Sequence, residues 1–190
     1  MIIGIVGFKQ SGKDTFADWF VGSAGFQKYS FAKPLKQGVM NFFGWTDHQL
    51  NDPVLKEQVD EFWGISPRQA LQWIGTDAMR VGLPGAYPQF QAITANNIWV
   101  KRFERTVALE PETNWIIPDV RFQNEVDAIK EIGGTLVRIH RESAVPKHIE
   151  HASEDVGLLK GIDVQIHNEG SILALHREAQ ELHRNLRGLV

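Results

Sequence analysis

The chain has 190 residues, a formal net charge of -3 and no cysteine, which excludes disulfides, thiolate catalysis and cysteine-based zinc sites. Its hydrophobic content of 43% is typical of a soluble globular domain. The sequence has neither the basic excess of a nucleic-acid-binding surface nor an apolar run of about 18 residues that would cross a membrane. We therefore expect one domain over residues 1–190, without nucleic-acid or membrane partners. Since no signal peptide is visible, we expect it in the cytoplasm.

The first predicted elements are a strand, a glycine-rich loop and a helix. Residues 1–6 form an apolar run, residues 7–13 match G-x-x-x-x-G-K, and residues 14–20 have the spacing of an amphipathic helix. This order is the context of a phosphate-binding P-loop, where backbone N–H groups, a helix N-terminus and a lysine surround phosphate oxygens. The predicted ATP-binding residues here are Lys9, Gln10, Ser11, Gly12, Lys13, Asp14 and Thr15. The alternative is a glycine turn that matches the pattern by chance.

The loop departs from the commonest P-loop pattern at one position. Asp14 follows Lys13, where a serine or threonine usually meets Mg²⁺, and Thr15 comes one residue later. A hydroxyl at this later position occurs in small-molecule kinases such as adenylate kinases. We therefore predict Thr15 as the hydroxyl near the metal, and Asp14 either acts through water or caps the helix.

Strand-like and helix-like segments alternate along the rest of the chain. The predicted strands are 26–31, 115–118, 135–139 and 163–166, and the predicted helices are 33–43, 53–62, 66–80, 96–108, 122–132 and a closing helix from Ile172 to Leu186. This alternation indicates an α/β fold with a parallel sheet covered by helices on both faces. The strand-free segment 44–111 is too long for a simple crossover, so we interpret it as a helical insertion that binds an acceptor near the strand ends.

Asp119 and Arg121 follow the strand predicted at 115–118. A carboxylate at that strand end can hold Mg²⁺ or its waters, and an arginine can grip a phosphate with two hydrogen bonds. The alternative is that Asp119 only caps the helix at 122–132 and Arg121 is solvated. Asn124 and Glu125 either serve the site or lie on the exposed face of that helix.

The predicted helix at 66–80 begins with Ser66 as N-cap and Pro67 as its first residue. On α-helical spacing it carries two rows of side chains, Arg68, Gln72 and Thr76 in one and Gln69, Trp73 and Asp77 in the other. These residue types suit phosphate capture, base-edge hydrogen bonds and base stacking. The alternative is an ordinary amphipathic helix with Trp73 in the core.

Two loops after the later strands also carry candidate residues. Segment 141–162 reads as a polar, lid-like loop from which Arg141 and Lys147 could reach the transferred phosphate. His148, Glu150 and His151 suggest a metal site, but no third histidine and no aspartate stands beside them in a recognisable pattern. Residues 168–171 form either a turn with an N-cap or an adenine-binding loop that includes Asn168.

Taken together, these segments resemble the deoxynucleoside monophosphate kinases of tailed bacteriophages. The matching segments, which span nearly the whole chain, are 7–15, 31–36, 68–80, 117–125, 133–134, Arg141, 151–154 and 166–171. The most specific are S-G-K-D-T at 11–15 and D-V-R-F-Q-N-E at 119–125. The resemblance implies a five-stranded P-loop kinase fold with strand order 2-3-1-4-5.

It also implies transfer of the γ-phosphate of ATP to a deoxynucleoside monophosphate (dNMP) with Mg²⁺, in the host cytoplasm if the chain comes from a phage. Catalytic roles would fall to Lys13, Asp119, Arg121 and Arg141, metal contacts to Thr15 and Asp119, and substrate contacts to Lys36, Arg68, Gln72, Trp73, Asp77 and Arg121. The partners would be these small molecules, and the chain would act either alone or as a homodimer. Two alternatives are a dephospho-coenzyme A kinase-like enzyme and a nucleotide-binding switch without transfer.

Overall fold

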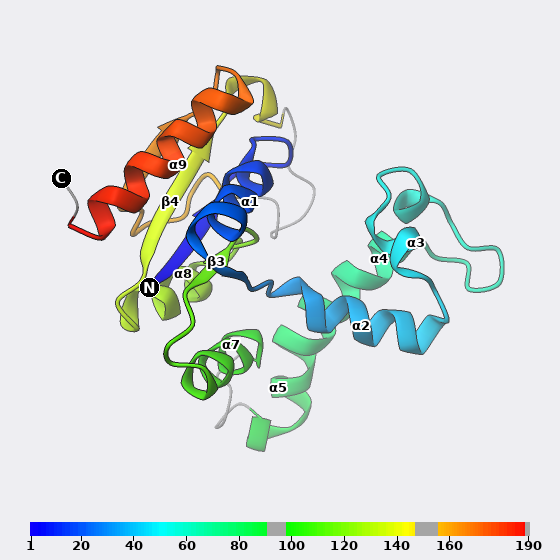
Figure 1. The fold of residues 1–190 in the computed structure, drawn as a ribbon. Coiled ribbons are helices and arrows are strands. Elements are labelled where there is room, and N and C mark those ends of the chain that lie inside the picture. The colour runs from blue at the N-terminus through cyan, green and yellow to red at the C-terminus, as the bar shows by residue number, and fades with distance from the viewer. Residues whose placement is uncertain (91–97, 147–155, 189–190) are drawn as a thin grey trace. The chain divides into compact units, whose positions relative to one another are not determined.

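The computed structural model describes residues 1–90, 98–146 and 156–188, and the chain divides into two compact units (Figure 1). The sheet unit contains Met1–Ser30 and Thr106–Val190, and the helical unit contains Phe31–Arg105. These boundaries differ from the predicted insertion at 44–111. The helical unit starts earlier because helix α2 (Ala32–Phe43) packs Val39 into the same core as Trp45, Leu50 and Ala70.

The sheet unit is built on five parallel strands in the order β2-β3-β1-β4-β5. The strands are β1 (Ile2–Val6), β2 (Gln27–Lys28), β3 (Trp115–Ile117), β4 (Thr135–His140) and β5 (Val164–His167). The predicted strand order is therefore confirmed. β2 is shorter than the predicted 26–31, since its pairing with β3 joins Gln27 to Trp115 and Lys28 to Ile116. The N–H groups of Gln27 and Tyr29 donate to the carbonyls of Asn114 and Ile116.

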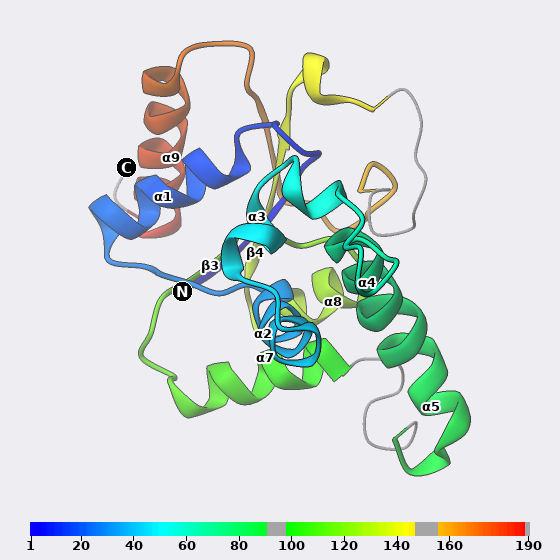
Figure 2. The same cartoon turned by 90° about the vertical axis from the view of Figure 1, so that its right-hand side faces the viewer.

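Helices cover both faces of this sheet (Figures 1 and 2). On one face α1 (Lys13–Ala24) and α9 (Ile172–Leu186) bury Phe16, Phe20 and Leu175 against alternate residues of the strands, including Ile3 and Ile5. On the other face lies α8 (Gln123–Glu131), whose Ile129 sits so close to Gly4 that a Cβ there would lie 2.8 Å from its Cδ1. The period-two alternation of β1 thus gives each face its own packing partner.

The helical unit has its own small core. Besides α2, it contains α3 (Asp47–Asn51), α4 (Pro67–Gln72), α5 (Leu83–Ala86) and most of α7 (Ile98–Leu109), which continues into the sheet unit. Apolar side chains of α2 and α4 meet around Trp45 and Leu50. Among the described residues of both units, no helix combines the length and apolar character needed to cross a membrane.

The predicted helix at 53–62 is wrong. Only a single 3₁₀ turn, Leu55–Glu57, forms there. The Asp52 carboxylate accepts hydrogen bonds from the N–H groups of Val54 and Leu55, and Asp60 accepts from those of Phe62 and Trp63. Such local side-chain bonds compete with helical ones, so the two aspartates turn the chain instead of letting a helix propagate.

The predicted helix at 66–80 begins as expected but changes character. Ser66 caps α4 by accepting the N–H of Gln69, and Pro67 is its first residue. From Trp73 to Gly82 the backbone is a π-helix. There each N–H reaches back five residues instead of four, as Leu83 does to the Ala78 carbonyl at its end. The α-helical spacing assumed for the two side-chain rows therefore holds only as far as Gln72.

Candidate functional site

The loop between β1 and α1 turns sharply at two residues with positive φ. Gln10 and Gly12 both have left-handed backbone, with φ of 67° and 98°, and Gly12 is the N-cap of α1. A Cβ at Gly7 would lie 2.5 Å from Ser11 Oγ and 2.8 Å from the Ile139 carbonyl oxygen, so only glycine fits there. The strand, loop and helix predicted for residues 1–20 are confirmed. The loop ends at the N-terminus of α1, and a glycine-rich loop followed by a helix N-terminus is an arrangement that binds phosphate.

The side chains of this loop differ in exposure. Lys9, Gln10 and Asp14 are exposed, Thr15 is half-buried and Ser11 is buried. Asp14 lies in the first turn of α1, where a carboxylate stabilises the helix dipole, but Gly12 and not Asp14 is the N-cap. The interpretation of Asp14 as a cap is therefore wrong.

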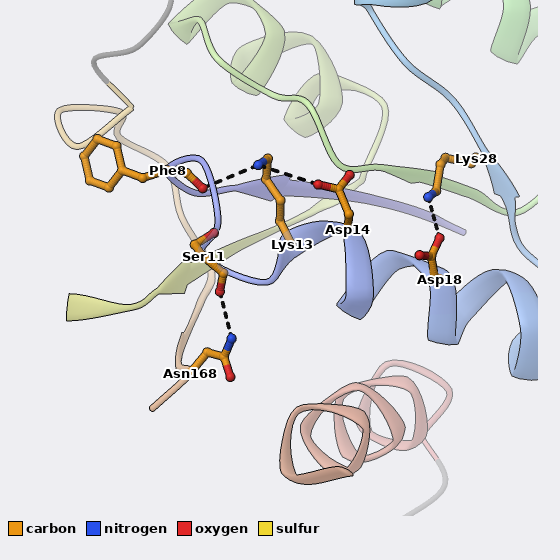
Figure 3. Close-up of polar contacts among 7 residues, drawn as sticks. All are labelled: Phe8, Ser11, Lys13, Asp14, Asp18, Lys28 and Asn168. Atoms are coloured by element: carbon orange, nitrogen blue, oxygen red, sulfur yellow. Dashed lines mark hydrogen bonds and ion pairs between the residues drawn. The ribbon is translucent and has the colours of Figure 1, made fainter. Parts of the chain in front are cut away.

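Lys13 is the charged centre of the loop (Figure 3). Its Nζ donates a hydrogen bond to the Phe8 carbonyl oxygen at 3.4 Å and lies 3.8 Å from Asp14 Oδ2. Burial lowers the pKa of Lys13. The Asp14 carboxylate opposes that shift, Arg121 adds to it, and Asp119 opposes it more weakly. The nearby carboxylates thus do not fully compensate the desolvated ammonium, and an anionic phosphate would be a favourable counter-charge.

The segment after β3 brings Asp119 and Arg121 into the electrostatic range of Lys13. Phe122, and not Asp119, is the N-cap of the following helix, so that part of the alternative is wrong. Its other part agrees with the structure, since the Arg121 side chain is exposed. Glu125, which is buried, accepts hydrogen bonds from the N–H groups of Arg121 and Phe122 at 2.8 and 3.2 Å. Glu125 therefore holds the backbone that carries Arg121, and the alternative that placed Glu125 on the exposed face of the helix is wrong.

Asp119 itself has a partner that the sequence did not suggest. Ser30 Oγ donates a hydrogen bond to Asp119 Oδ2 at 2.7 Å. Ser30 directly precedes the segment 31–36, so its place beside that motif was the only sequence signal that could have singled it out. The bond fixes one carboxylate oxygen next to the phosphate loop.

Asn168 reaches the P-loop from the end of β5. Its Nδ2 donates to the Ser11 carbonyl oxygen at 2.8 Å, and the side chain is 7% exposed (Figure 3). Ser171 Oγ accepts the Ala174 N–H and caps α9. The predicted turn with an N-cap is thus present at 168–171, whereas adenine binding by this loop stays a prediction.

Arg141 follows β4 and is half-buried. It precedes a 3₁₀ turn at Glu142–Ala144, where the Glu142 N–H donates to Glu169 Oε1 at 2.7 Å. The rest of the predicted lid falls partly on residues 147–155, so the predictions for Lys147, His148, Glu150 and His151 lie outside the described residues.

In the helical unit, Arg68 and Lys36 already have polar partners. Arg68 Nη1 lies 3.3 Å from Glu57 Oε1, and Lys36 Nζ donates to Asn51 Oδ1. Sequence reasoning missed Asn51, at the end of α3, and Glu57, between α3 and α4, because it assigned no function to residues 47–57. These contacts orient two cations that the sequence predicts as substrate ligands.

Trp73 and Asp77 lie in the π-helix, and Gln72 is the last residue of α4. Trp73 is 59% exposed, so the alternative that places it in the core is wrong. The Trp99 indole donates to the Gly75 carbonyl at 3.0 Å, within the I-G-T-D segment. Trp99 therefore supports the π-helix from α7, a role that spacing along one helix could not reveal.

The residues near the P-loop suit a phosphate-bound metal better than a site made by protein alone. Within residues 1–90, 98–146 and 156–188, no group of three or more histidine or carboxylate side chains could hold a metal ion. Mg²⁺ usually keeps several waters and takes few protein ligands beside substrate phosphates. The Thr15 hydroxyl and the Asp119 carboxylate are oxygen donors of the right kind, so the residues fit Mg²⁺ held with a nucleotide.

A family model and a curated relative, both described as deoxynucleotide monophosphate kinases, match this chain. A family model described as "Deoxynucleotide monophosphate kinase" matches residues 1–81. A protein of Acanthamoeba polyphaga mimivirus, named "Putative deoxynucleotide monophosphate kinase", is 34% identical over 178 residues, which cover 90% of each chain. The likeness thus extends through both units.

Among solved structures, the chain is similar to a shikimate kinase from Aquifex aeolicus, with 16% identity, a TM-score of 0.48 and coverage of 99% of both chains. It is also similar to a dephospho-CoA kinase from Campylobacter jejuni, with 17% identity, a TM-score of 0.48 and coverage of 97% of this chain and 96% of that one.

Proposed function

The chain belongs to the deoxynucleotide monophosphate kinase family, and on this premise we propose that it transfers the γ-phosphate of ATP to the 5′-phosphate of a deoxynucleoside monophosphate, with Mg²⁺. The observation that carries the proposal is the P-loop, whose half-buried Lys13 lacks full charge compensation and lies in range of Asp119 and Arg121. These groups belong to one compact unit, so their proximity does not depend on where the helical unit lies.

In the proposed reaction, an acceptor phosphate oxygen forms a bond to the γ-phosphorus while the bond from that phosphorus to the bridging oxygen breaks. ADP leaves and a deoxynucleoside diphosphate forms. The acceptor is already an anion, since the second pKa of a phosphate monoester is about 6, and needs no proton removed. Catalysis then depends on positioning and on neutralising charge.

The sheet unit supplies the donor side of this proposal. The loop from Lys9 to Gly12 would bind the ATP phosphates through its N–H groups, and Lys13 would contact the β- and γ-phosphates. Thr15 and Asp119 would hold Mg²⁺ directly or through water, and a bound Mg²⁺ would neutralise phosphate charge. Arg121 would bind the acceptor phosphate, and Arg141 the transferred group.

The helical unit supplies the acceptor side. We assign Arg68 and Lys36 to the acceptor phosphate, because both are cations that a neighbouring side chain already orients. Trp73 is an exposed aromatic ring that could stack on a base, and Gln72 and Asp77 could bond base edges. Phosphoryl transfer must exclude water, so the proposal requires the acceptor phosphate to be shielded from solvent during transfer.

A coupled assay that detects ADP tests the proposal. ATP and Mg²⁺ would be combined with each of the four dNMPs, with the matching ribonucleotides, and with dephospho-coenzyme A. We expect ADP formation that depends on at least one dNMP and that the Lys13→Ala variant loses. Turnover of dephospho-coenzyme A alone would indicate a hydroxyl acceptor, and ATP binding without any turnover would indicate a switch.

A further inference from the structure

Two consecutive residues at the end of β5 bond two different loops of the sheet unit. Asn168 donates from Nδ2 to the Ser11 carbonyl oxygen at 2.8 Å, and Glu169 accepts the Glu142 N–H on Oε1 at 2.7 Å. The first bond reaches the P-loop, and the second reaches the segment that begins with Arg141. We propose that Asn168 and Glu169 form a clamp that positions the P-loop and the Arg141 segment; the proposal deepens, and rests on, the kinase function proposed above.

The clamp has a fixed base. Asn168 donates its own backbone N–H to the His140 carbonyl oxygen at 2.7 Å, at the end of β4. Its side chain is buried, and a Cβ on Gly12 would collide with its amide. The amide is therefore packed against the loop as well as bonded to it.

The P-loop needs such support because its backbone is not regular. Ser11 lies between Gln10 and Gly12, whose φ angles are both positive, and a left-handed non-glycine residue such as Gln10 is unfavourable by itself. The Ser11 carbonyl is not used by the first turn of α1, where Phe16 bonds to the Gly12 carbonyl instead. Asn168 gives that buried carbonyl its partner, which orders the loop before a nucleotide arrives.

Glu169 acts on the neighbouring loop by a different contact. Its exposed side chain accepts the first N–H of the 3₁₀ turn Glu142–Ala144, directly after Arg141. The bond needs an acceptor oxygen at Oε1 but no negative charge, so the side-chain carbonyl of glutamine can also accept it, whereas alanine has no acceptor. Both residues are thus positioning residues that act through the loops they hold.

Amide hydrogen exchange on the free protein tests the clamp without any ligand. We expect Asn168→Ala to speed exchange about tenfold in peptides that cover residues 8–13, and Glu169→Ala to speed it in a peptide that covers residues 141–146. Glu169→Gln should keep the slow exchange of the wild type. Gln165→Ala, on the exposed side of β5, is the matched control and should change neither peptide. Unchanged exchange in Asn168→Ala, or equal effects of Glu169→Gln and Glu169→Ala, would overturn the clamp.

The consequence for the nucleotide is measured separately. Direct titration with a non-hydrolysable ATP analogue should give a Kd about tenfold higher for Asn168→Ala than for the wild type, a loss of about 1.4 kcal/mol in binding free energy. Thermal melting should show that the variant is folded. The dNMP KM should stay within about twofold. A wild-type Kd despite faster exchange would refute loop preorganisation. If the wild type phosphorylates no dNMP, the kinase proposal fails, but hydrogen exchange still decides the clamp.

Discussion

Ser30 Oγ donates a hydrogen bond to Asp119 Oδ2 across 2.7 Å, although the two residues are 89 positions apart in the sequence. Ser30 is the last residue of the sheet unit before the chain enters the helical unit. The carboxylate predicted to hold Mg²⁺ is therefore oriented by the residue at which the chain leaves the sheet.

Replacing Ser30 with alanine should loosen this carboxylate. We expect kcat to fall about three- to tenfold, in line with a net hydrogen-bond contribution of about 0.5–1.5 kcal/mol, and the Mg²⁺ concentration for half-maximal rate to rise. Ser30→Thr keeps the hydroxyl and should restore both values. Ser23→Ala, an exposed serine on α1, is the control. Equal Mg²⁺ dependence in Ser30→Ala and the wild type would contradict the role.

Asp119→Asn separates metal binding from base chemistry. If Asp119 acts on Mg²⁺, kcat should fall and excess Mg²⁺ should recover part of the loss, since a phosphate acceptor needs no base. A general base predicts instead a rate that stays low at every Mg²⁺ concentration and rises with pH. Mg²⁺ titrations of both proteins at two pH values distinguish the two, and a wild-type rate in the variant would remove Asp119 from the mechanism.

Lys13→Ala should lower kcat by about 10²- to 10³-fold, the usual loss when one group that stabilises developing charge is removed. The fold should persist, because the contacts of the ammonium with the Phe8 carbonyl oxygen and Asp14 Oδ2 are long, at 3.4 and 3.8 Å. Lys28→Ala is a suitable control, since Lys28 pairs with Asp18 on the surface (Figure 3). The rate and the far-UV circular dichroism spectrum should be measured together; activity within threefold of the wild type would argue against the assignment.

Arg68→Ala should raise the dNMP KM by about tenfold or more and leave the ATP KM nearly unchanged, because a bond to a charged group contributes about 1.5–3 kcal/mol. Glu57→Gln provides the comparison, since it removes only the carboxylate that lies 3.3 Å from Arg68. If Arg68 served only this ion pair, the two variants would lower the melting temperature alike and neither would change the dNMP KM.

Trp99→Phe should destabilise the helical unit by about 1 kcal/mol, since it removes the indole bond to the Gly75 carbonyl. We also expect a several-fold higher dNMP KM, because the π-helix carries Trp73 and Asp77. Trp63→Phe loses a comparable indole bond, to the Phe43 carbonyl, outside the π-helix. Denaturant unfolding and substrate titration of both variants decide the point, and an equal rise of KM in both would show that the effect is not specific to the π-helix.

The sheet could be predicted from the sequence because its signals are local. Apolar strand runs, the glycines of the loop and the stripe of α9 each lie within a few residues, and the order of strands followed from the resemblance. The alternative that Asp119 caps α8 also rested on a local signal, and it is wrong. Asp119 looked like a cap by position, but Glu125 reaches back to the N–H groups of Arg121 and Phe122.

The helical unit was harder to predict because its geometry departs from regular α-helix. Asp52 and Asp60 bond nearby backbone N–H groups and turn the chain where a helix was predicted at 53–62. The π-helix from Trp73 to Gly82 changes which side chains align, and no residue type in that segment signals it. The partner contacts of Ser30, Trp99 and Asn168 link segments far apart in sequence, so a single sequence gives no local pattern for them.

The sheet order also constrains how the chain can assemble during synthesis. β1 pairs only with β3 and β4 among the described strands, and its residue Ile3 faces Ile116 and Thr135. The whole helical unit is made in between and can close its own local contacts first, since contacts near in sequence form fastest. The phosphate loop is thus translated early but completed late. Asn168, which bonds the Ser11 carbonyl, is synthesised 157 residues after Ser11.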